Sequence, residues 1–386
     1  MNNKKLKILF ISHVYPRFFG DSMGCHVHRL SESFVKAGNQ VFVLAPHSKN
    51  LKRNQQMHGV DIKRYKYFYE SGQDLCYSHS FKKKISSFLG MIKLFFLILS
   101  CTKEIYKLLD EKKIDVIHAH WSFPSGIIVF LFSYFRKIKW FVSFHGADLR
   151  LLDNGLLRAL TKKIISRCNG VTTVSSNAMP HYFSKIQNNS CSIPMPIEDE
   201  FFFNPKKKKI KSNIFTFLTV ASLTPTKKIN DSIKAFKLIK DHNPNIKMQI
   251  IGDGPEKEKL YSLVKTLNLQ DSISFLKHVP SKKIVEVYDS ADAFLLVSEG
   301  EGLGVSVAEA LSRNIPVILT NDAGLKDYKS YNPYYVELNN IENLAKKMDE
   351  VINRGSVNIN LNIANTIKSK FSGAEVTKNF LDFYTK

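Results

Sequence analysis

The stretch from Ala293 to Gly324, AFLLVSEGEGLGVSVAEALSRNIPVILTNDAG, constrains the fold of this chain more than any other. An apolar run over 293–297 predicts a buried strand, and a second run over 315–320 predicts another. Between them a turn rich in glycine leads into a helical pattern with Val305, Ala308 and Leu311 at helical spacing. This order predicts a strand–loop–helix–strand unit of a parallel α/β sheet.

Two carboxylates, Glu301 and Glu309, stand eight positions apart at the junction of this loop and helix. Glycines let backbone N–H groups converge where the helix begins, and a helix N-terminus favours an anion. A carboxylate repels phosphate, so we expect the two glutamates to hold hydroxyl groups instead. The pattern predicts a ligand with an anionic middle and hydroxylated ends, such as a nucleotide-diphosphate sugar. The alternative is an ordinary crossover whose glutamates are solvated.

These residues resemble the Glu-(seven residues)-Glu signature of retaining glycosyltransferases of family 4 (glycosyl transferases group 1). The resemblance extends around the signature, to Glu301-Gly302, Glu309-Ala310 and Pro316-Val317. It implies an α/β chain with the GT-B fold, in which two Rossmann-like domains have parallel sheets that face each other across a cleft. It also implies transfer of a sugar with retention of anomeric configuration.

The length of 386 residues is sufficient for two domains, each with its own core. From the resemblance we expect an N-terminal, acceptor-side Rossmann-like domain over 1–195 and a C-terminal domain over 196–370 that binds the nucleotide sugar. A last helix over 371–386 is expected to cross back to the N-terminal domain. An apolar run over 171–175 is expected to be the last strand of the first domain.

The resemblance assigns roles in donor binding to several residues of the second half. Lys227 falls on the lysine that meets the diphosphate, a task that suits a compact ammonium group, whereas Ser222 stands where the family often has arginine. Glu309 is expected to hold the ribose hydroxyls and Glu301 the sugar hydroxyls. The remaining expected donor contacts are Gly302, Leu303, Gly304, Val305, Gly254, His278 and Val279.

In the first half, polar residues follow predicted strands, and the carboxyl ends of parallel strands are where open α/β sheets bind ligands. His145 follows the apolar run over 140–144, and by resemblance it lines the transferred sugar. The alternative is a structural histidine. The expected acceptor-side residues are Gly24, His28, Arg29, His120, Trp121 and Asp148.

Three observations bear on metals and cofactors. No helical His-x-x-x-His pair or carboxylate set completes a zinc site. His28 and Arg29 are expected either to meet a phosphate or an acidic sugar, or to be exposed residues of a first helical turn. No Asp-x-Asp occurs in the sequence, so no bridging divalent metal is expected. The expected co-substrate is a nucleotide-diphosphate sugar carried on UDP or GDP, with no other cofactor.

The chain is strongly basic, with 56 Lys and Arg against 34 Asp and Glu and a net charge of +22. Such a field favours anionic partners such as nucleotide sugars, acidic glycans, anionic lipid or nucleic acid. Nucleic acid is not expected, because no basic motif interleaved with aromatic residues is present. Two alternative functions remain: a nucleotide-sugar epimerase of the GT-B fold, and a basic nucleic-acid-binding protein.

The segment over 81–109 combines Lys82-Lys83-Lys84 with the apolar run ISSFLGMIKLFFLILS. One interpretation is an interfacial helix that uses 82–99 on an anionic membrane surface. The other, which we favour, is a crossover helix that packs on the sheet and keeps a basic, aromatic rim exposed.

Five widely spaced cysteines indicate a reducing compartment, and no uncharged run of membrane-spanning length occurs. We therefore expect a cytoplasmic protein, peripheral at the inner face of the plasma membrane. By resemblance, its acceptor is a glycan or a lipid-linked glycan of a bacterial surface polysaccharide, such as capsule, O-antigen or exopolysaccharide.

Overall fold

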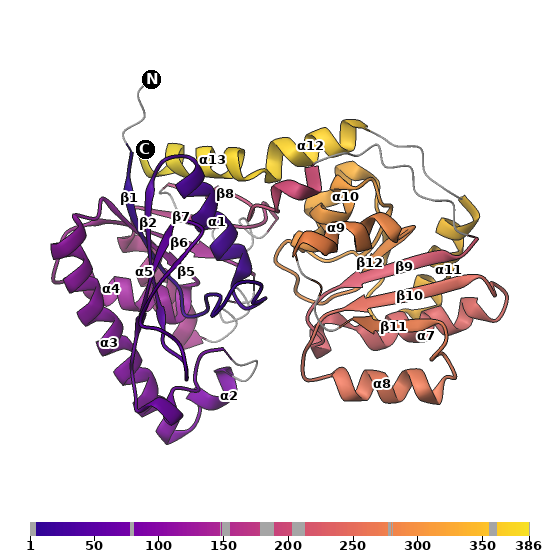
Figure 1. Cartoon of the computed structure of the whole chain (residues 1–386), viewed down its shortest axis with the longest axis horizontal. Helices are drawn as coiled ribbons and strands as arrows, with labels where there is room; N and C mark the ends of the chain where they lie inside the picture. The colour runs from indigo at the N-terminus through magenta and orange to yellow at the C-terminus, as the bar shows by residue number, and fades with distance from the viewer. Residues whose placement is uncertain are drawn as a thin grey trace. The chain divides into compact units, whose positions relative to one another are not determined.

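The structure is a computed structural model that describes residues 5–77, 81–146, 148, 155–177, 189–202, 213–276, 279, 281–354 and 361–385. The chain divides into two compact units, shown in Figure 1. The first unit joins Met1–Pro196 to the C-terminal segment Gly373–Lys386, and the second unit is Ile197–Ser372. The expected boundaries, after 195 and after 370, lie close to these.

Within the described residues, the first unit contains an eight-stranded sheet. Its strands are β1 (Lys7–Ile11), β2 (Gln40–Pro46), β3 (Asn54–Met57), β4 (Val60–Tyr65), β5 (Val116–His120), β6 (Lys139–Phe144), β7 (Gly170–Thr173) and β8 (Ser190–Ser192). They lie in the order β3-β4-β2-β1-β5-β6-β7-β8, and only the β3–β4 pair is antiparallel among these strands. The central strand β1 is an uninterrupted apolar run from Ile8 to Ile11, at most 1% exposed, because both faces of a parallel sheet are covered.

One expected strand boundary is wrong. The run over 171–175 is not the last strand of the first unit, because β8 pairs in parallel with β7 beyond it. The short, partly exposed sequence Ser190–Ser192 has no apolar run that would reveal a strand. Its place in the sheet comes from backbone hydrogen bonds to β7, and local sequence does not encode that pairing.

The α-helices in the described part of the first unit are α1 (Cys25–Lys36), α2 (Phe81–Ile85), α3 (Phe88–Lys112), α4 (Ile127–Phe132), α5 (Gly155–Arg167) and α13 (Gly373–Thr385). The C-terminal helix α13 belongs to this unit because it packs on α1. The rings of Phe380 and Tyr384 lie 6.1 and 6.0 Å from the ring of Phe34. The hydroxyl of Tyr384 also hydrogen-bonds the buried ring of His118 on β5.

In the described part of the second unit, six parallel strands form one sheet in the order β11-β10-β9-β12-β13-β14. The strands are β9 (Phe215–Val220), β10 (Ile246–Ile251), β11 (Ile273–Leu276), β12 (Ala293–Leu296), β13 (Val317–Thr320) and β14 (Tyr334–Val336). The helices are α7 (Ile229–Lys240), α8 (Lys257–Thr266), α9 (Ser281–Ser290), α10 (Val305–Ser312), α11 (Ile341–Arg354) and α12 (Leu361–Phe371).

Both sheets reverse their strand order at one point. The chain adds strands in one direction from β1 to β4 and restarts on the other side with β5; in the second unit it does the same between β9 and β12. Loops that leave two such neighbouring strands diverge to opposite faces of the sheet, which opens a crevice outside their carboxyl ends. Each unit therefore has one topologically favoured place for a ligand. Among the described residues, no helix combines the length and the apolar composition that crossing a membrane requires.

Candidate active site

Lys227 and Glu301 meet at the strand-order reversal of the second unit. Lys227 ends a short 3-10 turn, η5 (Pro225–Lys227), that follows β9, and Glu301 lies in the loop that follows β12. The two strands are hydrogen-bonded neighbours, so their loops start side by side. The loops are also tied directly, because the amide of Glu299 donates to the carbonyl oxygen of Thr226 at 2.8 Å.

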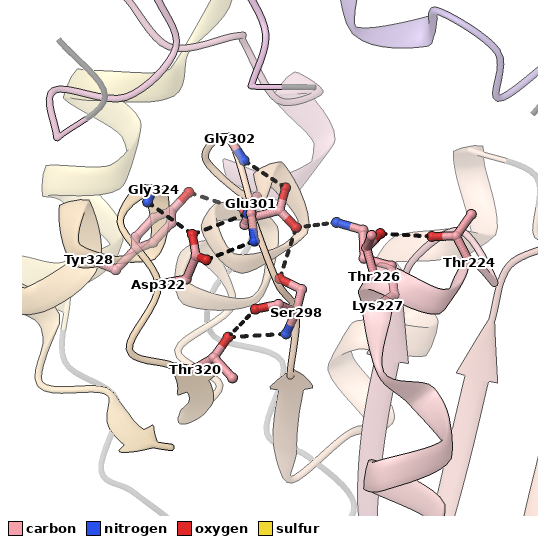
Figure 2. Close-up of polar contacts among 12 residues, drawn as sticks. Thr224, Thr226, Lys227, Ser298, Glu301, Gly302, Thr320, Asp322, Gly324 and Tyr328 are labelled. Atoms are coloured by element: carbon pink, nitrogen blue, oxygen red, sulfur yellow. Dashed lines mark hydrogen bonds and ion pairs between the residues drawn. The ribbon is translucent and has the colours of Figure 1, made fainter. Parts of the chain in front are cut away.

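The carboxylate of Glu301 is surrounded by donors, as Figure 2 shows. Its Oε2 accepts from the ammonium group of Lys227 and, at 3.2 Å, from the hydroxyl of Ser298. Its Oε1 accepts from the amide of Gly302 at 3.2 Å. Burial acts to raise the pKa of Glu301, but the charge of Lys227 and these hydrogen bonds outweigh it and hold the pKa below its usual value. Glu301 is therefore an anion at neutral pH.

Asp322 holds the loop around Glu301 in place. Its carboxylate accepts from the amides of Gly300 at 2.8 Å, Glu301 at 3.1 Å and Gly324 at 3.3 Å. Sequence reasoning did not single out Asp322. The available signal was its position two residues after an apolar strand that pairs with β12, the same strand-end argument that selected His145.

Two glycines let the loop take this shape. A Cβ at Gly324 would lie 2.2 Å from the carbonyl oxygen of Glu301 and 2.3 Å from that of Gly302, so no larger residue fits there. Gly304 precedes α10 with φ of 67°, a left-handed conformation that favours glycine. Its carbonyl oxygen accepts from the hydroxyl of Tyr328 at 3.2 Å. Among the other predicted donor contacts, the side chain of Leu303 is buried, so only its backbone could meet a ligand. Val305 is the first residue of α10.

Glu309 lies in the middle of α10 and is only 6% exposed. Its Oε2 accepts from the hydroxyl of Tyr288 on α9 at 2.7 Å. This bond fixes one edge of the carboxylate. Burial among apolar neighbours keeps water away from a charged group, which argues against the alternative of a solvated glutamate at this position. Tyr288 was not predicted, because nothing in the local sequence links it to a residue on another helix.

The other predicted donor contacts have mixed outcomes. Gly254 packs under the backbone of Leu223, since a Cβ there would lie 2.4 Å from the Leu223 carbonyl oxygen. Val279 is half-buried, and His278 lies outside the described residues. Ser222 is exposed. Lys228 has a left-handed φ of 43° and pairs with Glu299 at 3.4 Å.

In the first unit, His120 and His145 meet at the carboxyl ends of the neighbouring strands β5 and β6. Nδ1 of His120 lies 3.1 Å from Nε2 of His145, and the ring of Trp121 lies 4.4 Å from the ring of His145. Asp148 ties their loops together, accepting from the amide of His145 at 2.9 Å and of Ser122 at 3.1 Å. The structure thus brings His120, Trp121, His145 and Asp148 together, as strand-end reasoning predicts.

Burial sets the charge of this cluster. It lowers the pKa of both His120 and His145 well below the usual value, so both rings are neutral at pH 7. It raises the pKa of Asp148 to about 6, against the opposing effect of hydrogen bonds from backbone amides. A neutral imidazole ring can donate a hydrogen bond to a hydroxyl group and accept one from it.

Two more histidines join the cluster without having been predicted. The ring of His13, two residues after β1, lies 4.8 Å from Trp121, and the ring of His26 on α1 lies 5.1 Å from His145. Nδ1 of His13 and Nε2 of His26 are buried without a hydrogen-bond partner in the described structure. His13 follows a strand at the order reversal and could have been found by the same rule as His145. His26 comes from a helix and could not.

The remaining predicted acceptor-side residues, Gly24, His28 and Arg29, lie at the start of α1 or within it. Gly24 caps α1 with φ of 73°, and a Cβ there would lie 2.4 Å from the carbonyl oxygen of Val14. His28 contacts the hydroxyl of Tyr15 through Nδ1 at 2.7 Å, and Arg29 is partly exposed. In the described part of the chain, ligand atoms of His28, Glu32 and His58 lie within 4.8 Å of one another, so these three side chains could hold a metal ion.

Two sequence profiles of known families match the chain. The profile "Glycosyl transferases group 1" matches residues 200–368, in the second unit. The profile "Glycosyltransferase Family 4" matches residues 23–187, in the first unit. Together they span most of both units.

Relatives that align over most of this chain agree with the profiles. An uncharacterised glycosyltransferase from Haemophilus influenzae is 26% identical, over 72% of this chain and 77% of its own. TuaC from Bacillus subtilis, a glycosyltransferase named for teichuronic acid biosynthesis, is 25% identical over 83% of this chain and 82% of its own. An alpha-monoglucosyldiacylglycerol synthase from Streptococcus pneumoniae is 22% identical over 80% and 70%.

Solved structures share the fold. Sucrose-phosphate synthase from Thermosynechococcus elongatus superposes with a TM-score of 0.82 at 15% identity, covering 99% of this chain and 98% of that one. Anabaena HepE in complex with UDP-glucose superposes with a TM-score of 0.74 at 15% identity, covering 98% and 99%. These likenesses establish the GT-B fold, with two parallel-sheet domains, as expected from the sequence. The profiles and the fold together show that this chain belongs to family 4 of the group 1 glycosyltransferases.

Proposed function

We propose that this glycosyltransferase moves a sugar from a nucleotide-diphosphate sugar, carried on UDP or GDP, to a glycan or lipid-linked acceptor with retention at the anomeric carbon. The proposed setting is the synthesis of a bacterial surface polysaccharide at the cytoplasmic face of the plasma membrane. Support comes from the relatives named for teichuronic acid and for a glucosyl diacylglycerol, and from the structural neighbour that carries UDP-glucose. The proposed reaction uses no metal.

The observation that carries this proposal is the ion pair of Lys227 and Glu301 at the strand-order reversal. The pair places one cation and one hydroxyl-accepting anion next to each other, on loops that Asp322 and Thr226 hold in position. A diphosphate carries more negative charge than one carboxylate and would compete for Lys227. Glu301, released from the ammonium group, would then accept hydrogen bonds from the sugar hydroxyls.

Glu309 completes the donor site in this proposal. Tyr288 holds the carboxylate through Oε2, and in this proposal the carboxylate accepts the paired hydroxyls of a ribose. A carboxylate that accepts two vicinal hydroxyls makes two charge-assisted hydrogen bonds, which are stronger than neutral ones. This role does not distinguish UDP from GDP, because both carry the same ribose.

The proposed chemistry is positional and electrostatic. The acceptor oxygen bonds to the anomeric carbon on the face from which the diphosphate departs, and the acceptor proton passes to the leaving diphosphate oxygen. Lys227 stabilises the negative charge that develops on that oxygen. The neutral ring of His145 can hydrogen-bond a hydroxyl of the transferred sugar without adding charge. No protein side chain needs to form a covalent intermediate.

The test is thermal unfolding with UDP, GDP, ADP and CMP, each in excess and with a chelator present. A ligand at about 100 times its dissociation constant stabilises the folded state by about 2.7 kcal/mol. We expect a shift with one nucleoside diphosphate, and loss of that shift in Glu309→Ala. The matched control is Glu258→Ala, an exposed glutamate on α8 of the same unit, which should keep it. An unchanged affinity in Glu309→Ala would refute the ribose assignment.

Product analysis then tests the reaction. With donor and acceptor present, NMR of the product should show the anomeric configuration of the donor sugar. An inverted product would refute retention. A donor that is epimerised with no acceptor present would instead establish the epimerase alternative, and a need for added divalent metal would refute metal independence.

A further inference from the structure

Six large apolar side chains are exposed on the first half of α3. This set, called here the α3 apolar face, consists of Phe88, Leu89, Met91, Phe95, Phe96 and Leu99. Phe88 is 77% exposed and Phe95 is 62% exposed. Contiguous apolar surfaces of this kind are rare on soluble monomers and mark interaction sites.

The exposure is not a consequence of poor packing by the helix. Successive helical residues turn by about 100°, so the six side chains fall within one arc of roughly 160°. The opposite side carries Leu97, Cys101 and Ile105, each 0% exposed in the core of the first unit. The helix therefore already buries one apolar side against its own domain, and the α3 apolar face is a second, unpartnered one.

Lys93 does not interrupt this face, although it interrupts the apolar run in the sequence. Its side chain lies on the domain side of the helix and is only 8% exposed. Its ammonium group pairs with Asp74 at 2.6 Å and lies 5.6 Å from the ring centre of Phe68. The single charge within the run is thus turned away and neutralised, which leaves the outward side of the turns from Phe88 to Leu99 without a charged residue.

The charges at the two ends of the face bear on what it could bind. From Phe81 to Lys103 the sequence holds five lysines and no Asp or Glu. Lys83 in α2 and Lys103 in α3 are exposed on either side of the face, whereas Lys84 pairs with Asp74 at 3.2 Å. An apolar strip with lysines at both ends fits an anionic lipid surface, where rings enter the acyl boundary and ammonium groups meet the headgroups.

We propose that the α3 apolar face, with Lys83 and Lys103, docks the protein on an anionic lipid bilayer. The helix would lie in the plane of the interface rather than cross it. A second copy of the chain is a poorer partner, because face-to-face pairing would bring like-charged lysines together. The inference deepens the proposed function, since it rests on a lipid-linked acceptor for its purpose, but docking itself is measured without sugar transfer.

The experiment is flotation of the full chain with vesicles of phosphatidylcholine, with and without phosphatidylglycerol, at low and physiological salt. We expect binding to the anionic vesicles that is stronger at low salt. The combined variant Phe88→Ser, Phe95→Ser and Leu99→Ser should lower the partition coefficient by at least about tenfold. The matched control is Leu238→Ser with Tyr261→Ser, two exposed apolar residues of the second unit, which should bind like the unaltered protein.

Two further variants resolve the contributions. Lys83→Glu with Lys103→Glu should weaken binding to anionic vesicles and leave any binding to neutral vesicles unchanged. Phe95→Trp should show a blue shift in emission when anionic vesicles are added, because the indole enters the acyl boundary. Each variant is first checked for an unchanged melting temperature, so loss of binding cannot be loss of folding.

The outcomes separate this inference from the proposed function. Failure of the unaltered protein to float with anionic vesicles at low salt would overturn docking, as would equal binding by the triple variant. A dimer in sedimentation that the triple variant abolishes would assign the face to self-association and also overturn it. Stabilisation by a nucleoside diphosphate, measured without lipid on the same samples, tests the donor site independently.

Discussion

The histidines of the first unit make its stability strongly dependent on pH. Burial lowers the pKa of His13 and His26 to about 4 and that of His118 to about 3, against 6.5 for an ordinary histidine. A histidine with a depressed pKa binds a proton in the unfolded chain, but not in the folded chain, at pH values between its folded-state pKa and 6.5. Stability is therefore full above pH 6.5 and is lost as the pH falls from 6.5 towards 4.

The size of the effect follows from these pKa values. At about pH 5 each of the three histidines favours the unfolded state by about 2 kcal/mol. Asp148 opposes them: its pKa is raised to about 6, so its protonation on acidification restores about 1 kcal/mol. These four groups together lower the free energy of unfolding by about 5 kcal/mol between about pH 7.5 and about pH 5, and the depressed pKa values of His120 and His145 add to this loss. This is a large part of the total stability of a typical domain.

The assay is urea unfolding monitored by tryptophan fluorescence. Trp121 and Trp140 are the only tryptophans of the chain, and both lie in the first unit, so their emission reports on that unit alone. His26→Gln removes one buried titrating ring while keeping a polar side chain. It should reduce the pH-dependent loss by about 2 kcal/mol, whatever its effect at neutral pH. A free energy of unfolding that stays constant from neutral pH to about pH 5 would refute the neutral, buried state of the cluster.

The remaining predictions concern the second unit. Asp322→Ala should destabilise it by about 3 kcal/mol and raise the donor KM at least about tenfold, because three loop amides lose a charged acceptor. Thermal unfolding and initial rates measure these two changes. The control Asp241→Ala, which removes an exposed pair with Lys237, should change stability by less than about 1 kcal/mol. Equal effects of the two substitutions would refute the role of Asp322 in holding the loop. Tyr288→Phe should lower the free energy of unfolding of the second unit by about 1–3 kcal/mol and weaken nucleotide binding, because Glu309 loses a buried hydrogen bond. Calorimetric titration that gives an unchanged dissociation constant would show that Tyr288 does not position Glu309.

Strand-end reasoning succeeded where one strand determines the position of a residue. His145 follows an apolar run directly, and Glu301 lies in the loop just after one, so each run fixes the edge of the sheet near which the side chain emerges. Neighbouring strands then bring Lys227 to Glu301 and His120 to His145. Such pairs follow from the parallel order of the strands, which alternating strand and helix patterns predict.

Residues that reach a site from other elements were not predictable in this way. Tyr288 and His26 lie on helices, where many side chains could face either solvent or a site. The orientation of Lys93 was likewise invisible in the sequence, because a lysine in an apolar run looks like an interruption of it. The structure shows that the lysine turns inward to Asp74, nineteen positions away.

The sequence by itself determined the two α/β sheets, the family signature and the polar residues that follow the strands, because apolar periodicity and residue spacing are local properties. Only the tertiary structure decided which side chains share a hydrogen bond, which rings are neutral, and that α3 has two apolar sides of which one stays exposed. These properties depend on burial and on contacts between residues far apart in the chain. Desolvation and partner geometry, which set charge and exposure, exist only once the elements have packed.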